Sequence, residues 1–344
     1  MIKCRTAENI KWEEVKQNMK MEYGAKRSKV KGSRKNQENI NKLIEYSKNP
    51  LKIINYFGSR GHLKFIPDPW YLKIIYRARL GKKLNLSNPQ TYTEKIQWLK
   101  LYDRKAGYSN LVDKYEVRKF IAKTIGEQYL IPLIGVYQTF DEIDFDQLPN
   151  QFVLKCTHDS GSVVICKDKL KFDKKAAEKR LNLQMKKNYY YPSREWPYRH
   201  IKPRIICEAY LDDGENEVPK DYKIFCFHGE PKFIFLLHDR FHKELPRSGT
   251  VYTTDWEIEP CVFDSHYMRN TNKEEKPKCL AKMLELCRIL SKGFPQVRID
   301  FYTIKDKCYF GEMTLTHSGG FCQIKPEAYD ELLGSFLRLP GRPG

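Results

Sequence analysis

The sequence predicts a fold of the α+β class, with antiparallel hairpins and helices in separate stretches of the chain. Residues 297–315 alternate apolar and polar side chains on both sides of a short polar turn, which indicates a hairpin with one buried face. A second hairpin is predicted over residues 152–166. Residues 276–290 repeat apolar side chains at helical spacing, and this helix is expected to cover the sheet.

The N-terminal part differs in composition from the rest. Residues 1–50 carry 13 Lys and Arg against 6 Asp and Glu, and KRSKVKGSRK is too polar to pack on its own. We interpret residues 1–48 as a basic, partly helical extension, either an arm that contacts an anionic polymer or lipid surface or a solvated helical segment. The remaining parts are expected to be a mainly helical region (49–112), two α+β subdomains (113–210 and 211–340) and a tail (341–344).

Composition narrows the class of partner and compartment. The 344 residues carry a formal net charge of +19, which favours an anionic partner or a crowded basic surface. No apolar run approaches the roughly 18 to 20 residues of a membrane helix, and the N-terminus is not a secretory signal. Ten cysteines without CxxC or zinc-ligand spacing predict reduced thiols in a cytoplasmic protein. No RNP-type or helix-turn-helix signature occurs, so no nucleic-acid partner is expected.

Acidic side chains are predicted to face each other in the C-terminal hairpin. If its loop comprises residues 305–307, Asp300 lies directly opposite Glu312, with Cβ atoms about 5 Å apart. Arg298 points to the same face, because it lies two residues earlier on the strand. Like charges this close require a proton or a cation between them, and Mg²⁺ bridging phosphate oxygens suits the pair. The alternative is a surface ion network. The same face is expected to carry Phe310, Glu312 and Thr314.

Three lysines lie where they could bind phosphate. Lys114 is near the start of the helix predicted over residues 113–125, where backbone N–H groups favour anions. Lys155 follows a β-rich run and precedes the turn-rich THDSGS, which is either a flap whose amides close over phosphates or a plain hairpin turn. Lys223 alternates with apolar side chains on a strand predicted over residues 221–227 and could be the third cation.

The apolar strand over residues 204–211 has features of a nucleoside site. Glu208 lies near its end and could accept hydrogen bonds from ribose hydroxyls, and the backbone from Ala209 to Leu211 could meet the adenine edge. Upstream, interleaved Tyr, Arg and Trp side chains in NYYYPSREWPYRHIKPR could stack on bases, stack on sugar rings or brace a loop.

The order of these motifs resembles the ATP-grasp superfamily. Asp113–Lys114, FVLK with a Ser/Gly loop, a strand ending in Glu208, then RxD and GExT follow one another. Over roughly residues 65 to 340, segments such as LNLSNPQTYTEKIQWLKLYDR, DYKIFCFHGEP and YFGEMTLT are similar to the teichuronopeptide-biosynthesis-type (TupA-like) ATP-grasp family of bacterial polysaccharide clusters. The resemblance implies an ATP-grasp fold, in which two α+β subdomains clamp ATP between antiparallel sheets, with a helical N-terminal region.

The resemblance also implies a role for each matched residue. Thr314 stands where the superfamily often has Asn, which bears on a second metal ion, and Asp159 brings a negative charge into the flap. ATP would be bound by Lys114, Lys155, Ser160, Gly161, Ser162, Glu208, Ala209, Tyr210 and Leu211. Magnesium would be bound by Asp300, Glu312 and Thr314, while the catalytic cations would be Lys223, facing the triphosphate, and Arg298, stabilising the phosphoryl group in transfer.

The implied activity is that of an ATP- and Mg²⁺-dependent carboxylate–amine ligase that releases ADP. It would join an amino acid or peptide to a uronic acid carboxyl of a bacterial surface polysaccharide or its precursor. The partners would then be an anionic glycan and an amine substrate, with peripheral membrane contact open to the basic N-terminal arm. One alternative is a kinase on the same scaffold that phosphorylates a sugar hydroxyl. Another is a non-catalytic binder of an anionic polymer.

Overall fold

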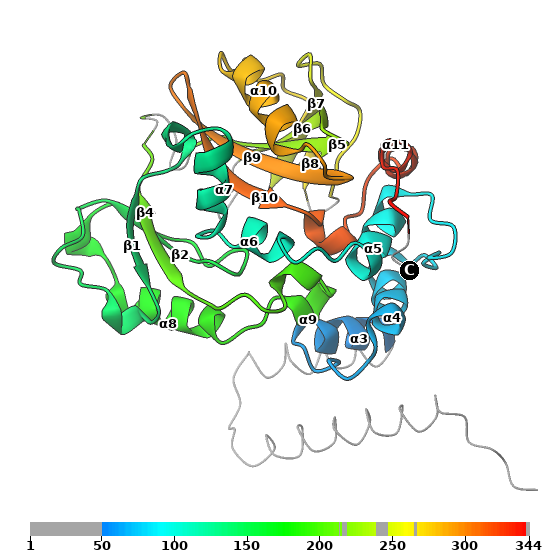
Figure 1. Cartoon of the computed structure of the whole chain (residues 1–344), viewed down its shortest axis with the longest axis horizontal. Helices are drawn as coiled ribbons and strands as arrows, with labels where there is room; N and C mark the ends of the chain where they lie inside the picture. The colour runs from blue at the N-terminus through cyan, green and yellow to red at the C-terminus, as the bar shows by residue number, and fades with distance from the viewer. Residues whose placement is uncertain (1–49, 213, 215–218, 239–246, 265–266, 342–344) are drawn as a thin grey trace, which may run out of the picture. The chain divides into compact units, whose positions relative to one another are not determined.

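Two sheets, one of four strands and one of six, form the framework of the chain (Figure 1). The computed structural model describes residues 50–212, 214, 219–238, 247–264 and 267–341. The chain divides into two units, residues 1–53 and 54–344, and both sheets belong to the second unit. The predicted basic extension (1–48) and most of the predicted tail (341–344) therefore lie outside the described residues.

The four-stranded sheet is antiparallel, with its strands in the order β1-β4-β2-β3. The predicted hairpin is confirmed, since Phe152 pairs with Cys166 and Leu154 with Val164. Apolar side chains of β2 and β4 pack with α8 and residues 140–148 into a core of their own. The strands are β1 (Leu133–Tyr137), β2 (Phe152–Cys156), β3 (Val164–Cys166) and β4 (Ile205–Ala209).

The six-stranded sheet has the order β10-β9-β5-β6-β7-β8. Neighbouring strands are antiparallel except β7 and β8, which are parallel. The two long central pairings, β9 with β5 and β9 with β10, place β9 inside the sheet, where both of its faces are covered. The strands are β5 (Asp221–Phe227), β6 (Glu230–His238), β7 (Ser248–Thr253), β8 (Met268–Arg269), β9 (Gln296–Ile304) and β10 (Lys307–Thr314).

Helices cover both faces of the six-stranded sheet. The α-helices in the described part of the chain are α3 (Pro50–Ser59), α4 (Asp68–Leu80), α5 (Tyr92–Tyr102), α6 (Tyr108–Val112), α7 (Val117–Thr124), α8 (Lys174–Met185), α9 (Tyr190–Ser193), α10 (Leu280–Leu290) and α11 (Ala328–Phe336). On one face Phe225 and Phe235 pack with α4, α5 and α11. None of the helices in these ranges is long and apolar enough to cross a bilayer.

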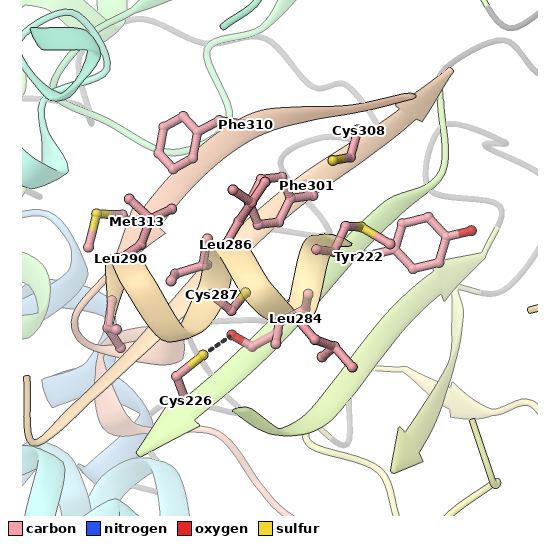
Figure 2. Close-up of a cluster of buried hydrophobic side chains, with 14 of the residues drawn as sticks. Tyr222, Cys226, Leu284, Leu286, Cys287, Leu290, Phe301, Cys308, Phe310 and Met313 are labelled. Carbon is pink, nitrogen blue, oxygen red and sulfur yellow. Dashed lines mark hydrogen bonds between the residues drawn. The ribbon is translucent and has the colours of Figure 1, made fainter. Parts of the chain in front are cut away.

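Helix α10 covers the opposite face, as its apolar repeat predicts. Figure 2 shows Leu286, Cys287 and Leu290 of this helix lying against Phe301 of β9 and Cys226 of β5. All of these side chains are less than 9% exposed, so the helix shields the sheet from water. The thiol of Cys226 donates a long hydrogen bond (3.8 Å) to the carbonyl oxygen of Ile224. The nine cysteines in the described residues are free thiols and buried.

The C-terminal hairpin pairs Asp300 with Glu312, as expected, but by a different route. Its turn has two residues rather than three, because Ile304 pairs directly with Lys307. The register then shifts between Phe310 and Glu312, where Gly311 forms a bulge. Because the bulge inserts one residue, it restores the expected pairing.

The expectation that Phe310 shares a face with Glu312 is wrong. Phe310 packs against Phe301 with ring centroids 6.4 Å apart, in the core beneath α10. The extra residue at the bulge reverses the alternation of side chains, so Glu312 and Thr314 point to the opposite face. The bulge therefore places the acidic side chains of both strands on one face.

We expect Gly311→Ala to destabilise the protein. An added Cβ would lie 3.1 Å from the carbonyl oxygen of Asp300 and 3.1 Å from Cε2 of Tyr302. The backbone of Asp300 cannot move without disturbing the bulge, so the free energy of unfolding should fall by about 1–3 kcal/mol in urea denaturation. Gly107→Ala is the control, because Gly107 has φ −66° and nothing within 4 Å of its Cβ position. Equal stability of the two variants would contradict this assignment.

Candidate active site

Arg298 connects the charged groups at the centre of the six-stranded sheet. Its Nε and Nη2 atoms donate to the two carboxylate oxygens of Asp300 at 2.7 and 2.8 Å. The same Nη2 donates to Oε1 of Glu312 at 2.6 Å, and Nη1 donates to Nδ1 of His317 at 2.7 Å. The side chains of Arg298 and Asp300 are only 8% and 3% exposed. A buried guanidinium thus binds two of the three predicted metal ligands, Asp300 and Glu312, at once.

Lys223 lies on the other side of Asp300. Its Nζ atom donates to Asp300 at 2.6 Å and to Asp221 at 2.7 Å. These contacts follow from the register, in which Lys223 of β5 pairs with Asp300 of β9, and from the spacing of two that puts Asp221 on the same face. The predicted catalytic cations, Arg298 and Lys223, are therefore brought together around one carboxylate.

Burial and charge set the ionisation of this cluster. Burial raises the pKa of Asp300 to about 6, against the opposing effect of the Arg298 and Lys223 cations. Burial also lowers the pKa of Arg298, but Asp300 and Glu312 outweigh it and raise that pKa above its ordinary value. Burial and the Arg298 charge hold the pKa of His317 well below its usual value. His317 is therefore neutral at pH 7 and accepts the Arg298 hydrogen bond through Nδ1.

Glu312 and Thr314 form the more open edge of the cluster. The side chain of Glu312 is 36% exposed, and the Thr314 hydroxyl donates to its Oε1 at 3.3 Å. Among the described residues no group of three or more His, Cys, Asp or Glu side chains is placed to hold a metal ion. Two hard carboxylates do suit Mg²⁺, which is usually held by one or two protein carboxylates together with phosphate oxygens and water. The donor set of Asp300 and Glu312 therefore fits a magnesium ion that arrives with a nucleotide.

An apolar pocket adjoins this cluster. It has a volume of about 590 Å³ and contains five of the predicted nucleotide-binding residues. Its other walls are mostly aliphatic and come from β2, β3 and the segments beside them. The five are Lys155, Glu208, Ala209, Tyr210 and Leu211.

Tyr302 connects the pocket to the charged cluster. It lines the pocket and lies on β9 two residues after Asp300, hence on the same face of the strand. Arg298, Asp300 and Tyr302 therefore form one continuous row, with about 7 Å between alternate residues. A nucleotide whose base enters the pocket can thus extend its phosphates along β9 to the acids.

Glu208 is paired with two cations in the pocket. Its carboxylate lies 2.5 Å from Nζ of Lys155 and 3.1 Å from Nη1 of Arg118. Lys155 and Glu208 share a face of the sheet, because Val153 pairs with Glu208 in the β2–β4 register. Arg118 is also held by the carbonyl oxygen of Ile131 at 2.7 Å. The N–H of Ala209 donates to the carbonyl oxygen of Pro132, so this donor is already paired. Contacts of Ala209, Tyr210 and Leu211 with an adenine edge stay predictions.

The flap loop is braced from inside. Ser160 and Gly161 are exposed, whereas Ser162 is buried; its hydroxyl donates to Asp159 at 2.6 Å and accepts from the N–H of Cys156 at 2.8 Å. Asp159 is 4% exposed, so its carboxylate is buried within the loop. Lys114 donates to the carbonyl oxygen of Asp159 and so lies against the same loop. Roles for Ser160, Gly161 and Ser162 in binding phosphate stay predictions.

The structure adds four residues that sequence reasoning missed. Asp221 could have been found from its spacing of two from Lys223, and Tyr302 from its spacing of two from Asp300. Arg118 lies four residues after Lys114 in DKYEVR, a spacing that suggests one helical face, although α7 begins only at Val117. His317 carried no signal, because it follows the strand in an irregular segment.

A buried lysine positions the segment that carries His317. Nζ of Lys100, on α5, donates to the carbonyl oxygens of Ser193 and Gly319 at 2.6 Å each. Glu195 accepts hydrogen bonds from the hydroxyls of Ser193 and Thr316. The chain from residue 318 to 320 takes positive φ at three consecutive residues, a conformation that needs such support. The segment that places His317 beside Arg298 is thus held by α5 and by residues 194–198.

We expect turnover of Mg·ATP to fall as the pH drops through about 6. At pH 5 a carboxyl with a pKa of about 6 is roughly nine-tenths protonated, so it loses both its metal contact and its ion pairs. The kcat/KM for Mg·ATP, which reports the ionisation of the free enzyme, should therefore fall about tenfold between pH 7 and pH 5. An ADP-release assay over this range measures it, and a flat profile would contradict the assignment.

Unfolding driven by protonation of Asp300 cannot cause the loss of turnover at low pH. The folded pKa is raised above the unfolded value of 3.8, so the stabilising contribution of this titration is fully present below about pH 3.8 and is lost as the pH rises through about 6. Acid therefore favours folding through this group while it suppresses turnover. Thermal melts at pH 5 and pH 7 separate the two effects.

Comparisons with solved structures show which known proteins resemble this chain. A D-alanine–D-alanine ligase from Bacillus anthracis complexed with ATP is similar at 15% identity, with 60% of this chain and 55% of that chain covered and a TM-score of 0.35. The D-alanine–D-alanine ligase from Helicobacter pylori is 16% identical, with 72% of this chain and 69% of that chain covered and a TM-score of 0.36. The ATP-grasp ligase PsnB complexed with minimal precursor is 8% identical, with 61% of this chain and 54% of that chain covered and a TM-score of 0.33. The chain thus spans little more than half the length of the first and third of these structures.

A sequence family accounts for most of the chain. A search of curated proteins gave no match. The family model described as TupA-like ATPgrasp matches residues 94–338, which include both sheets and every residue of the charged cluster and the pocket. The chain therefore belongs to the TupA-like ATP-grasp family, and its fold is that of an ATP-grasp protein.

Proposed function

We propose that the protein is an ATP- and Mg²⁺-dependent, ADP-forming carboxylate–amine ligase. The observation that carries the proposal is the row formed on β9 by Arg298, Asp300 and Tyr302. This row runs from the charged cluster around Arg298 into the apolar pocket. In that pocket Lys155 and Glu208 supply a cation and a hydrogen-bond acceptor beside aliphatic walls. This is the combination that a nucleoside triphosphate needs.

The first chemical step would be phosphoryl transfer. An oxygen of the substrate carboxylate attacks the γ-phosphorus in line, the bond from that phosphorus to the β,γ-bridging oxygen breaks, and ADP leaves with its electron pair. Arg298 and Lys223 would neutralise the charge on the transferring group, and Glu312 and Asp300 would hold a magnesium ion. When bound, Mg²⁺ would supply further neutralisation of phosphate charge. The protein contributes mainly positioning and a preorganised field.

The second step would form the amide. The amine nitrogen attacks the acyl carbon of the acyl phosphate, the carbon–oxygen bond to phosphate breaks, and inorganic phosphate leaves while the amine loses a proton. We assign the carboxylate to a uronic acid of an anionic polysaccharide or its precursor, and the amine to an amino acid or peptide. The net charge of +19 supports an anionic substrate, and the motifs shared with the TupA-like family support the polysaccharide setting.

Binding of ATP would exchange partners within the site. Without nucleotide, the cations are neutralised internally: Lys155 pairs with Glu208, and Lys223 and Arg298 pair with Asp300. Phosphate oxygens can replace these carboxylates as acceptors, which frees Glu208 for the ribose and an oxygen of Asp300 for the metal ion. Each cation therefore already lies where the phosphates must arrive, which lowers the cost of ordering them.

Nucleotide analysis tests the proposal. The full chain is incubated with Mg·ATP, a panel of uronic-acid oligosaccharides and a panel of amino acids, and nucleotide and glycan products are identified by mass spectrometry. We expect ADP, phosphate and an amide-linked product only when both co-substrates are present. ADP with glycan alone and a phosphorylated sugar would establish a kinase instead. AMP with pyrophosphate would show adenylation, and no magnesium-dependent nucleotide binding would overturn the enzyme assignment.

A further inference from the structure

A broad groove on the helical region lies apart from the ATP site. Its volume is about 1020 Å³, and it is formed by the start of α4, the segment 83–87 and the end of α5. The structure describes the entire lining, and no Asp or Glu is part of it. The polar side chains of the lining are Lys73, Lys83, Asn85, Ser87 and Tyr102.

Two lysines give the groove an uncompensated positive charge. Lys73 and Lys83 are both exposed, and neither forms an ion pair with any described residue. The neighbouring Lys82, by contrast, is paired with Glu327. The ammonium of Lys73 instead lies 5.5 Å from the centroid of the Trp70 ring. No acid lines the groove, and the carboxylate of Glu94, which lies beside Asn85, accepts hydrogen bonds from the backbone N–H groups of Asn85 and Gln90. The two unpaired lysines therefore favour an anionic ligand.

An exposed aromatic surface borders the same groove. Trp70 is 62% exposed on α4, next to Pro69 of the lining, and Phe65 is 54% exposed just before the helix. A solvated Trp face offers a large rigid apolar surface, which suits the C–H face of a pyranose ring. Inorganic phosphate has no apolar face to place on such a surface.

The turn beside the lysines supplies hydrogen-bond donors. The side-chain oxygen of Asn85 accepts from the N–H and the hydroxyl of Ser87 at 3.2 and 2.9 Å. This interaction fixes the side chain of Asn85, and its amide nitrogen has no partner among the described residues. An oriented amide donor beside two cations suits a carboxylate and its neighbouring hydroxyls.

Helix α5 connects the groove with the active site. Tyr102 at its end lines the groove, and Lys100, two residues earlier, binds the carbonyl oxygen of Gly319 in the segment that carries His317. Helices α4 and α5 lie beside each other in Figure 1, and they contact each other. A ligand bound in the groove therefore contacts α5, the helix that supports the charged cluster around Arg298.

We propose that this groove binds a carboxylate-bearing oligosaccharide, with Trp70 stacking on a sugar ring and Lys73, Lys83 and Asn85 binding carboxylates. The groove is a second attachment site for a polymeric substrate, and this role rests on the proposed ligase function, whereas binding itself does not. A longer chain would bind more tightly than a short one because it occupies the groove and the ATP site region together.

Direct binding measurements test the groove. The probe is a defined oligogalacturonate, titrated calorimetrically into the full chain at about 0.15 M salt without nucleotide or Mg²⁺. We expect Lys73→Ala combined with Lys83→Ala, and separately Trp70→Ala, to weaken binding at least tenfold, and Trp70→Phe to restore part of the loss. The matched control, Lys292→Ala with Lys307→Ala, removes the same charge at exposed positions and should retain the affinity of the wild type.

Four results would overturn the proposal. They are equal binding of the methyl-esterified oligosaccharide, equal binding of polyglutamate or single-stranded oligonucleotide, equal loss in the control variant, and no effect of Trp70→Ala. All variants should retain Mg·ATP affinity, because the groove shares no residue with the ATP pocket. Failure of ATP binding in the wild type would refute the ligase function and leave the groove measurement valid.

Discussion

Replacing Asp300 by Asn is expected to reduce ADP formation by about 10²- to 10³-fold. An amide cannot supply the anionic ligand that Mg²⁺ prefers, and it cannot neutralise Lys223 and Arg298, whose nitrogens lie 2.6 to 2.8 Å from the carboxylate. ATP without metal should still bind, because the two cations remain and lose a competing anion. The measurement is ADP release together with a Mg²⁺ titration of ATP affinity, in which the variant should no longer respond to the metal.

A matched substitution in the same hairpin serves as the control. Asp306 lies in the two-residue turn, and among the described residues its one ion pair is with Lys278, at 3.2 Å, where both side chains are more than 60% exposed. Asp306→Asn should therefore leave turnover within about twofold, because exposed ion pairs contribute little. If Asp300→Asn retained more than a tenth of the activity, the assignment of Asp300 to the metal ion would be wrong.

The second large effect is expected for Arg298→Lys. The guanidinium binds Asp300 through two nitrogens and also binds Glu312 and His317, and a single ammonium cannot reproduce this geometry. We expect kcat to fall about 10²- to 10³-fold, equivalent to roughly 3–4 kcal/mol of transition-state stabilisation. KM for ATP should change much less, because the apolar pocket that we propose to bind adenine, and Lys155 in it, are untouched.

Arg288→Lys provides the comparison for that variant. Arg288 is exposed on α10, and its ion pair with Glu230 at 3.2 Å is solvated. Both substitutions preserve the positive charge. The two variants therefore differ in that only Arg298→Lys removes the two-nitrogen contact with Asp300. Similar kinetics for the two variants would mean that Arg298 acts only as a point charge.

Much of the framework was predictable because it depends on local pattern. Alternation in residues 297–315 predicted one hairpin, and the β-rich runs on either side of the turn-rich THDSGS predicted the other, over residues 152–166. The apolar repeat over residues 276–290 predicted α10. Alternation also brought Arg298 and Asp300 to one face, since residues two apart on a strand share a face. The pairing of Asp300 with Glu312 was right, although the loop length assumed for it was wrong by one residue.

Long-range contacts were not predictable in this way. His317 reaches Arg298 because Lys100 and Glu195, distant in sequence, hold the intervening segment. The inward turn of Asp159 depends on Ser162 and on burial of the loop, so the negative charge that the sequence places in the flap lies inside it. No periodicity reports on these contacts, because each is made between elements whose separation in the chain is arbitrary.

By itself, the sequence determined the strand and helix types, the residues that share a face of β9, and membership of a family whose motifs occur in order. These properties follow from periods of two and 3.6 residues and from residue chemistry, which are local. Only the tertiary structure decided which face Phe310 takes, how Arg298 joins two carboxylates and His317, and that Tyr302 connects the pocket to the acids. One bulged glycine and the packing of distant segments set these positions, because a single inserted residue reverses every side chain that follows it in a strand.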